Sequence, residues 1–274
     1  MINRYTVIGQ PIAHSLSPVV HQLFGDLTQR KVKYTRTEAT PETFESIVLD
    51  WQRSGAKGCN ITAPFKELAV TVCQRMAPNA KRAGSVNTIE MHRDGALVGH
   101  NTDGAGLVAD IVVNKRRVLQ DSRILLLGAG GAARGVIAPL LDAGPTMLHV
   151  ANRTSAKADT LASLFSDMGP VSASGYEALG DMAAFDVMIN ATSLSLNGEM
   201  PPLPNGLVGS QTLAYDMTYA KQDTVFMSWS RSRGADTSSG LGMLVEQAAE
   251  SFFIWEGVRP KTRMVYPRLR ELLS

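Results

Sequence analysis

The chain is short of the residues that disulfide frameworks and metal sites need. Its 274 residues include two cysteines, Cys59 and Cys73, and five histidines that lack the spacing of metal ligands. So few cysteines indicate a reducing compartment, and we therefore expect a cytoplasmic protein without a metal ion. Because the first residues run directly into a strand pattern, we also expect no signal peptide.

Two further absences exclude classes of partner. The sequence has no long uncharged apolar run, so we expect no membrane span. Its net charge is only +2 and no basic tract stands out, which argues against a nucleic-acid-binding protein. What remains is an ordinary globular composition, 44% hydrophobic and 19% charged, which suffices for one large or two modest domains with a substantial core.

Strand and helix patterns alternate along the first hundred residues. Helix patterns occur at residues 17–27, 40–52 and 65–76, and strand patterns at 5–9, 32–36, 58–62, 86–91 and 96–99. The last two strands flank an Asp94-Gly95 pair that predicts a hairpin turn. Ser17-Pro18 and Thr40-Pro41 each predict an N-cap followed by proline at the first helical position. We therefore expect a mixed α/β unit.

A second α/β unit follows. A helix pattern at 107–114 leads to strand patterns at 124–127, 147–151, 185–190 and 212–216, and helices are expected at 242–257 and from about 262. Continuous apolar runs are typical of parallel strands that are covered on both faces. The predicted fold class is α/β, with a mixed-sheet N-terminal domain, a Rossmann-like second domain and a substrate cleft between them.

The most informative motif opens the second unit. Aliphatic residues 124–127 run into the cluster Gly128-Ala129-Gly130-Gly131-Ala132, and a helix pattern follows. This order of strand, turn and helix start is typical of sites for a dinucleotide pyrophosphate. Gly128 makes the turn, Gly130 lets the backbone approach the phosphates, and the helix start supplies N–H donors. Such turns also occur without a nucleotide.

A cationic group stands where NAD-binding folds carry an acid. About 20 residues after the first glycine, such folds hold the ribose 2′-hydroxyl with a carboxylate. Here the next strand ends in Asn152-Arg153-Thr154, with Lys157 one turn further on. Because guanidinium grips phosphate bidentately, the segment predicts NADP. The alternative is that Arg153 and Lys157 are solvated charges at a helix start.

Polar clusters at the ends of several strands carry a resemblance to a known family. They occupy residues 9–18, 60–66, 84–88 and 101–104, and segments 128–132, 152–154 and 242–248 continue the series. Taken singly, each cluster has a structural explanation such as a helix N-cap. In order and spacing, they resemble the shikimate dehydrogenases, NADP-dependent enzymes of aromatic amino-acid and chorismate biosynthesis, over nearly the whole chain.

The resemblance implies a reaction and a set of site residues. The reaction is the reversible reduction of 3-dehydroshikimate to shikimate by NADPH, with Lys66 and Asp103 as the proton-transfer pair in contact with substrate. The other implied substrate contacts are Ser15, Ser17, Thr62, Asn87, Tyr219 and Gln247. The expected cofactor contacts are Gly128, Ala129, Gly130, Gly131, Ala132, Asn152, Arg153, Thr154, Lys157, Thr192, Met217 and Gly240.

The resemblance also implies a discontinuous first domain. Residues 1–103 plus 241–274 would form the substrate-binding catalytic domain, and residues 104–240 the NADP-binding domain. This arrangement explains how Gln247 can belong to the site of the first domain. The expected partner is a small molecule, and the sequence is compatible with a monomer or a homodimer.

Three alternative functions remain open at the level of sequence. A paralogue with the same fold could accept quinate as well as shikimate or use NAD, although Arg153 and Lys157 argue against NAD. Methylenetetrahydrofolate dehydrogenases share a two-domain plan and a catalytic lysine, but they have no use for the Ser15 and Ser17 cluster. A non-catalytic sensor of nucleotide or shikimate would not need a proton-transfer pair.

Overall fold

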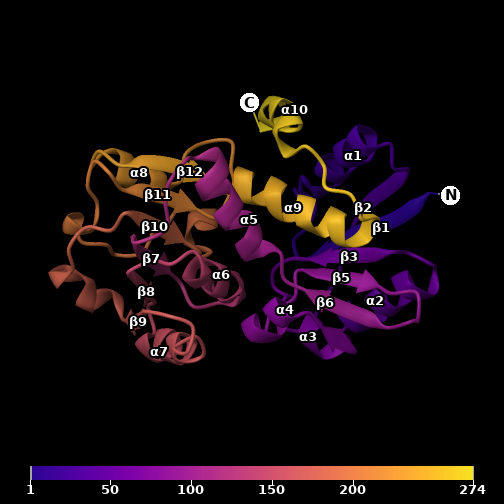
Figure 1. Ribbon diagram of the computed structural model, residues 1–274, viewed down its shortest axis with the longest axis horizontal. Coiled ribbons are helices and arrows are strands. Elements are labelled where there is room, and N and C mark those ends of the chain that lie inside the picture. Colours follow the sequence, from indigo (N-terminus) through magenta and orange to yellow (C-terminus); the bar gives the residue numbers. More distant parts are fainter. Residues whose placement is uncertain (1, 274) are drawn as a thin grey trace. The chain divides into compact units, whose positions relative to one another are not determined.

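The computed structural model describes residues 2–273, and contacts within it divide the chain into two compact units (Figure 1). Unit 1 comprises Met1–Gly106 and Leu244–Ser274, and unit 2 comprises Leu107–Met243. The chain passes between the units within two helices, α5 (Asp103–Ala109) and α9 (Leu241–Glu256). Each unit contains one six-stranded sheet.

The sheet of unit 1 is mixed. Its order is β2-β1-β3-β5-β6-β4, in which β3–β5 and β5–β6 are antiparallel and the other neighbours are parallel. The strands are β1 (Asn3–Gly9), β2 (Val32–Glu38), β3 (Gly58–Ile61), β4 (Arg75–Met76), β5 (Thr88–Met91) and β6 (Leu97–His100). Gly95 has a φ of +85° between β5 and β6, which confirms the predicted hairpin turn.

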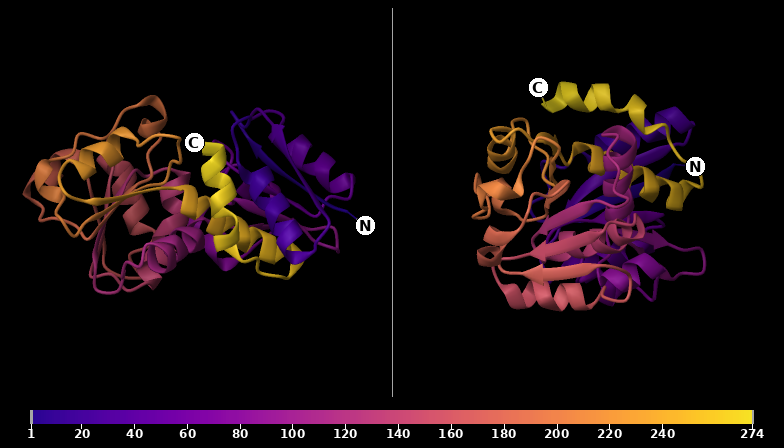
Figure 2. Two further views of the ribbon diagram at one scale, coloured as in Figure 1. Left: turned by 90° about the horizontal axis from the view of Figure 1, so that it is seen from above. Right: turned by 60° about the vertical axis from the view of Figure 1, so that its left-hand side comes forward.

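Helices cover both faces of this sheet. Their bounds are α1 (Ser17–Thr28), α2 (Phe44–Arg53), α3 (Ala69–Val72), α4 (Pro78–Ala83) and α10 (Tyr266–Leu273), besides the unit 1 part of α9. Phe44 of α2 packs with strand residues such as Ile61 on one face. On the other face α9 lies beside the strands (Figure 2), where Trp255 stacks on Tyr5 at 4.5 Å and donates a hydrogen bond to the Ile89 carbonyl.

The sheet of unit 2 is parallel throughout. Its order is β12-β11-β10-β7-β8-β9, which can be followed by the labels in Figure 1. The strands are β7 (Arg123–Leu127), β8 (Met147–Ala151), β9 (Val171–Ser174), β10 (Val187–Asn190), β11 (Leu213–Asp216) and β12 (Asp236–Ser239). This is the strand order of doubly wound dinucleotide-binding folds. All strands stay parallel, but from β7 the chain adds strands first on one side of the sheet and then, starting with β10, on the other. The two sheets confirm the predicted α/β class.

The strands of unit 2 are buried on both faces, as their apolar runs predict. Ile124 and Leu126 pack with α6 (Gly131–Asp142) and α7 (Ser155–Ser163), whereas Leu125 and Leu127 pack with Phe226 of α8 (Val225–Arg231). The connections contain a π-helix (Asp110–Asn114) and 3₁₀ turns (Tyr176–Asp181, Leu194–Asn197, Asn205–Leu207), and a further 3₁₀ turn in unit 1 (Thr262–Met264) precedes α10.

Two predicted helix starts are wrong. Ser17 is the first residue of α1 and not its N-cap, because Leu16 already has near-helical backbone angles and occupies that position without a side-chain cap. The second helix begins at Phe44, after Thr40 to Thr43 form a separate turn. In that turn Thr43 Oγ1 accepts a hydrogen bond from the Thr40 N–H at 2.9 Å. Local hydroxyl–backbone bonds compete with helix formation in this way.

The predicted helix over residues 65–76 is also wrong in extent. Only Ala69–Val72 is α-helical, and Arg75–Met76 forms β4 beside β6. The Gln74 N–H donates to the Leu97 carbonyl, and the Gln74 side chain accepts from the Leu97 N–H. Pairing with the sheet edge therefore overrides the helical pattern. The helix expected at 107–114 begins earlier, at Asp103, and continues as the π-helix.

Candidate functional site

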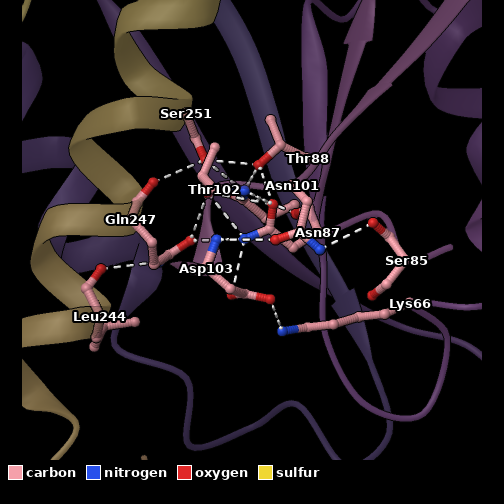
Figure 3. A network of polar contacts seen from close by, with 11 residues as sticks. Lys66, Ser85, Asn87, Thr88, Asn101, Thr102, Asp103, Leu244, Gln247 and Ser251 are labelled. Atoms are coloured by element: carbon pink, nitrogen blue, oxygen red, sulfur yellow. Dashed lines mark hydrogen bonds and ion pairs between the residues drawn. The ribbon is translucent and has the colours of Figure 1, made fainter. Parts of the chain in front are cut away.

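Lys66 and Asp103 form a partly buried ion pair in unit 1 (Figure 3). Lys66 lies in the turns that follow β3, and Asp103 is the first residue of α5. The Lys66 Nζ atom lies 2.6 Å from Asp103 Oδ2, and the side chains are 18% and 5% exposed. The pair is therefore accessible from the lysine side, while the carboxylate is enclosed by protein.

The Asp103 carboxylate is held from a second direction by Asn87. Asn87 Nδ2 donates to Asp103 Oδ1 at 2.9 Å, so each carboxylate oxygen has its own donor. Asn101 accepts a hydrogen bond from the Asp103 N–H through Oδ1 and donates to the Ser85 carbonyl through Nδ2. These contacts fix the start of α5 and the orientation of the Asp103 carboxylate, whose two oxygens both accept hydrogen bonds.

The orientation of the Asn87 amide is dictated by its neighbours. Its Oδ1 accepts from the backbone N–H of Thr102 at 2.8 Å and from the hydroxyl of Thr88 at 2.9 Å. Since a backbone N–H can only donate, the amide nitrogen must face the other way, towards Asp103 and Gln247. Asn87 is only 2% exposed, and its geometry is therefore set by protein groups.

Helix α9 brings Gln247 to this network (Figure 3). Gln247 Oε1 lies 3.3 Å from Asn87 Nδ2 and 3.4 Å from the hydroxyl of Thr102, while Nε2 donates to the Leu244 carbonyl. Gly106 of α5 permits a close helix crossing, because a Cβ there would lie 2.5 Å from the Gln247 backbone nitrogen. The two helices thus meet backbone to backbone beside the ion pair.

Ser15 and Ser17 lie at the start of α1 with their hydroxyls 3.2 Å apart. The Ser15 carbonyl accepts two hydrogen bonds from the Arg36 guanidinium, at 2.9 and 2.6 Å. Ser17 is buried beside the phenol of Tyr34, whose pKa is raised well above its ordinary value by burial and by nearby Cys59, with the Ser17 hydroxyl opposing. The phenol is therefore neutral and donates a hydrogen bond.

A buried chain of hydrogen bonds links this serine pair to the Asn87 network. Tyr34 donates to Asn60 Oδ1 at 2.7 Å, and Asn60 Nδ2 donates to the Asn87 carbonyl at 3.1 Å. Thr62 follows β3 in the same region, half-buried, with its N–H bonded to the Ile8 carbonyl. Seven of the candidates for substrate contact thus belong to unit 1, whereas Tyr219 belongs to unit 2.

Five buried residues of this network are not among the expected site residues, although three of them lie within the polar clusters at residues 60–66, 84–88 and 101–104. They are Tyr34, Asn60, Thr88, Thr102 and Ser251, of which Ser251 joins Asn60, Thr88 and Thr102 at one hydroxyl (Figure 3). One signal was available. Asn60 interrupts an otherwise apolar strand, and Ser251 lies on the apolar face of α9 between Ala248 and Phe252. A buried polar residue requires partners and so points to a network.

The glycine-rich turn of unit 2 has the geometry that its sequence predicts. Gly128 follows β7 with a φ of +107°, which favours glycine, and donates its N–H to the Ala151 carbonyl. Gly130 is the N-cap of α6, with no side-chain cap and with open space where a Cβ would stand. Ala129 belongs to the turn, and Gly131 and Ala132 are the first two residues of α6. An uncapped helix start with room above it fits a phosphate group.

The remaining cofactor candidates lie at the same edge of the sheet. Asn152, Arg153 and Thr154 follow β8, where Asn152 Nδ2 donates to the Thr154 carbonyl, and Lys157 lies in the first turn of α7. Arg153 and Lys157 are exposed. Thr192 follows β10, Met217 follows β11, and Gly240 follows β12. Because the carboxyl ends of parallel strands form the ligand edge of such sheets, these residues could line a dinucleotide.

The described residues contain neither a membrane-spanning helix nor a metal-binding cluster. No helix within residues 2–273 is long and apolar enough to span a membrane. The same part of the chain holds no group of three or more His, Cys, Asp or Glu side chains that could bind a metal ion. The Lys66–Asp103 pair of unit 1 can exchange a proton with a bound molecule, and the helix start at Gly130 in unit 2 can hold an anionic nucleotide.

Comparison with known proteins gives consistent results along the chain. Residues 7–89 match the shikimate dehydrogenase substrate binding domain, residues 110–197 match shikimate / quinate 5-dehydrogenase, and residues 240–266 match the shikimate 5′-dehydrogenase C-terminal domain. The NADP⁺ shikimate dehydrogenase of Aeromonas hydrophila is 51% identical over 274 residues, covering 100% of this chain and 99% of the relative.

Solved structures agree with these matches. An Ael1 enzyme from Pseudomonas putida is 44% identical with a TM-score of 0.91, covering 97% of this chain and 98% of that one. Shikimate dehydrogenase from Thermus thermophilus, solved with NADP(H) and shikimate, is 31% identical with a TM-score of 0.87, covering 98% and 99%. The chain therefore belongs to the shikimate dehydrogenase family of oxidoreductases.

Proposed function

We propose that this protein catalyses the reversible NADPH-dependent reduction of 3-dehydroshikimate to shikimate. The single observation that carries the proposal is the Lys66–Asp103 pair, in which a partly accessible ammonium is held by a carboxylate that Asn87 fixes from the other side. Reduction of a ketone requires a proton at the oxygen as the hydride reaches carbon, and this pair is built to supply one.

In this proposal, unit 1 binds the substrate. The hydroxyls of Ser15 and Ser17 hold its carboxylate, and Thr62, Asn87 and Gln247 bond its carboxylate or ring hydroxyls. Tyr219 is a further proposed substrate contact. The buried Tyr34–Asn60 link supports the proposal, because it ties the serine pair to the catalytic network in one fixed geometry. A site with such paired polar groups discriminates against analogues that leave them unpaired.

Lys66 and Asp103 act as one proton-transfer unit. Lys66 stabilises the negative charge that develops on the ketone oxygen and delivers a proton to it, while Asp103 fixes the ammonium and bonds the product hydroxyl. In the oxidation of shikimate, the same pair accepts the hydroxyl proton. Because the two groups lie 2.6 Å apart, they act on the same substrate oxygen as one unit.

Unit 2 binds NADP, which supplies or accepts the hydride when it is bound. The turn of residues 128–132 holds the pyrophosphate, and Asn152, Arg153, Thr154 and Lys157 hold the 2′-phosphate. Thr192, Met217 and Gly240 follow β10, β11 and β12, and they line the part of this sheet edge on the opposite side of β7 from β8. The relatives named as NADP⁺ enzymes support this choice of cofactor. We place the enzyme in the cytoplasm, where its two free cysteines stay reduced.

The test is an initial-rate measurement with purified protein, in which shikimate or quinate is combined with NADP⁺ or NAD⁺. Fast turnover confined to shikimate with NADP⁺ is the expected result. Comparable rates with quinate or with NAD⁺ would identify the broader paralogue instead. An absence of turnover with all four pairs, by protein that is folded, would contradict an enzymatic function.

A further inference from the structure

The strongest unexplained feature outside the catalytic pair is a buried carboxylate in unit 2. Asp216, the last residue of β11, is fully buried, and no residue between 2 and 273 forms an ion pair with it. A buried charge without a counter-ion is costly unless hydrogen bonds replace its hydration. The groups that donate hydrogen bonds to Asp216 therefore indicate its structural role.

Four donors surround Asp216, and they come from three separate segments. Oδ2 accepts from Asn190 Nδ2 at 3.2 Å, from the Ser195 hydroxyl at 2.6 Å and from the Thr224 hydroxyl at 2.7 Å. Oδ1 accepts from the Thr218 N–H at 2.9 Å. The donors are neutral, so the charge is stabilised entirely by oriented dipoles. One carboxylate thus joins the loop after β10, the loop after β11 and the start of α8.

The loop after β10 depends on this carboxylate through Asn190. Asn190 Nδ2 is committed to Asp216 and to the Ser195 hydroxyl, which leaves Oδ1 to accept from the N–H and the hydroxyl of Thr192, at 3.1 and 2.7 Å. Thr192 in turn lies against the glycine turn, because a Cβ on Gly128 would stand 3.2 Å from its methyl group. Asp216 therefore sets the position of Thr192 beside the pyrophosphate turn.

The loop after β11 depends on it directly. The Thr218 N–H bonds to Asp216 Oδ1, and the Thr218 carbonyl accepts from the Gly240 N–H at 3.0 Å. Met217, which lies between Asp216 and Thr218, donates its N–H to the Asn190 carbonyl. Its own carbonyl oxygen lies so near Gly240 that a Cβ there would stand 2.1 Å from it. Three of the residues proposed to contact the cofactor, Thr192, Met217 and Gly240, are thus held by bonds that lead to one carboxylate.

We infer that Asp216 is the positioning residue for the cofactor edge of unit 2. It does not contact the nucleotide itself, since it is fully buried. Its negative charge draws the donors of three loops to one point and so preforms the surface on which NADP binds. The inference rests on the proposed function, because it assumes that this edge takes NADP.

Thr224 and Thr212 provide a matched pair for the test. Each is a buried threonine of unit 2 whose hydroxyl donates one hydrogen bond of 2.7 Å and accepts one from a backbone N–H. Thr224 donates to Asp216, whereas Thr212 donates to the Phe185 carbonyl next to the amino end of β11. Replacement by valine removes one donated and one accepted hydrogen bond in each case, at the carboxyl end of the sheet for Thr224 and at the amino end for Thr212.

The experiment measures the dissociation constant of NADPH by calorimetry for the wild-type protein and for Asp216→Asn, Thr224→Val and Thr212→Val. Loss of a hydrogen bond to a charged group should raise this constant about tenfold in Asp216→Asn and Thr224→Val. Thr212→Val should bind NADPH like the wild type although it also lowers the melting temperature. The KM for shikimate should change less than the dissociation constant of NADPH, because seven of the eight candidate substrate contacts belong to unit 1 and only Tyr219 lies in the loop that Asp216 holds.

Four outcomes separate the possibilities. Weaker NADPH binding in the two Asp216-network variants, with Thr212→Val unaffected, supports the inference. Equal binding by all variants overturns it, and so does equal weakening in Thr224→Val and Thr212→Val, which would reveal a stability effect alone. A wild-type protein that does not bind NADPH overturns the proposed function and, with it, the inference. If Asp216→Asn does not fold, Thr224→Val and Ser195→Ala decide the result.

Discussion

At the scale of single residues, the ion pair of unit 1 acquires its chemistry from its neighbours. Lys66 and Asp103 would form an ordinary salt bridge if both were exposed, and such pairs contribute little. Here the carboxylate is 5% exposed and takes a second donor from Asn87, whose amide is oriented by the N–H of Thr102. The arrangement holds the ammonium in one place, which a proton donor requires.

Arg153 gives a prediction about cofactor choice at the same scale. It is exposed at the end of β8, and no acidic residue occupies that position. Arg153→Ala should raise the KM for NADP⁺ about tenfold or more, because a charge-assisted bond to phosphate is lost, and should leave the KM for NAD⁺ nearly unchanged. Steady-state kinetics with both cofactors measure the effect.

The control for Arg153 is Lys115→Ala, which removes the same charge from another exposed position of unit 2. That variant should leave both constants unchanged. An equal rise in the constants for NADP⁺ and NAD⁺ after Arg153→Ala would show that the residue holds a part of the cofactor that the two nucleotides share.

The sequence predicts a residue that carries a recognisable chemical group just after a strand, such as Arg153, whereas the role of Lys66 is expected only from the resemblance to a family. The sequence does not reveal residues that act through others. Asp216 looks like any acid at the end of a strand until its four donors are known, and the role of Ser251 depends on a helix that packs against strands far away in the sequence. Such roles arise from tertiary contacts, which no local pattern encodes.

At the scale of elements, the crossing of α5 and α9 positions Gln247. The helices approach so closely at Gly106 that a Cβ would meet three atoms of Gln247 within 2.8 Å, two of them backbone. Gly106→Ala should therefore displace Gln247 and raise the KM for shikimate several-fold, at a cost in stability of about 1–3 kcal/mol, typical of overpacking. Kinetics and thermal unfolding measure the two effects.

Gly206→Ala is the control for this prediction, because a methyl group there meets nothing within 4 Å. It should change neither the KM for shikimate nor the melting temperature appreciably. If Gly106→Ala also leaves the KM for shikimate at its wild-type value, Gln247 does not bind the substrate in the way proposed.

Elements with a clear hydrophobic pattern or turn signal are predicted well, whereas elements whose secondary structure depends on tertiary contacts are not. The apolar runs of β7 and β8 and the Asp94-Gly95 hairpin are found where the sequence places them. Of the helix expected at 65–76, only Ala69–Val72 is α-helical, because Arg75 and Met76 form backbone pairs with β6 in place of helical hydrogen bonds. The boundary at Thr40 shifts because hydroxyls bond locally, and the boundary at Ser17 shifts because Leu16 already has near-helical backbone angles.

At the scale of the whole molecule, the strand order lies beyond local reasoning. Periodicity predicts strands but not that β1 pairs with both β2 and β3, or that β10 lies beside β7. Nor does it predict that the last part of the chain belongs to unit 1, which was expected only from the resemblance to a family. Topology follows from which apolar faces can be buried together, and that is a property of the full chain.

His21 gives a prediction for the stability of the molecule against acid. It is buried in unit 1, stacked on Tyr34 at 4.3 Å with Phe24 and Trp255 nearby, and burial lowers its pKa to about 3. An unfolded histidine takes up a proton below about pH 6.5, whereas the folded one stays neutral. Its contribution to stability is therefore complete above that pH and is lost progressively as the pH falls towards 3, by about 1.4 kcal/mol per unit.

Denaturant unfolding between pH 7 and 4 tests this prediction. His21→Phe keeps an aromatic ring at the position but cannot be protonated, so its free energy of unfolding should fall less steeply with acid than that of the wild type. His14→Phe, at an exposed position, should retain the wild-type slope. Identical slopes for wild type and His21→Phe would show that His21 does not enter the acid response.

The most direct test of the central claim is the turnover number of Lys66→Ala with saturating shikimate and NADP⁺, beside Lys57→Ala as a control at an exposed position of the same unit. Because general acid–base groups contribute factors of about 10²–10⁴, Lys66→Ala should lose turnover by such a factor and still bind NADPH. Lys57→Ala should turn over normally. Near-normal turnover by folded Lys66→Ala would remove the lysine from the mechanism and contradict the account.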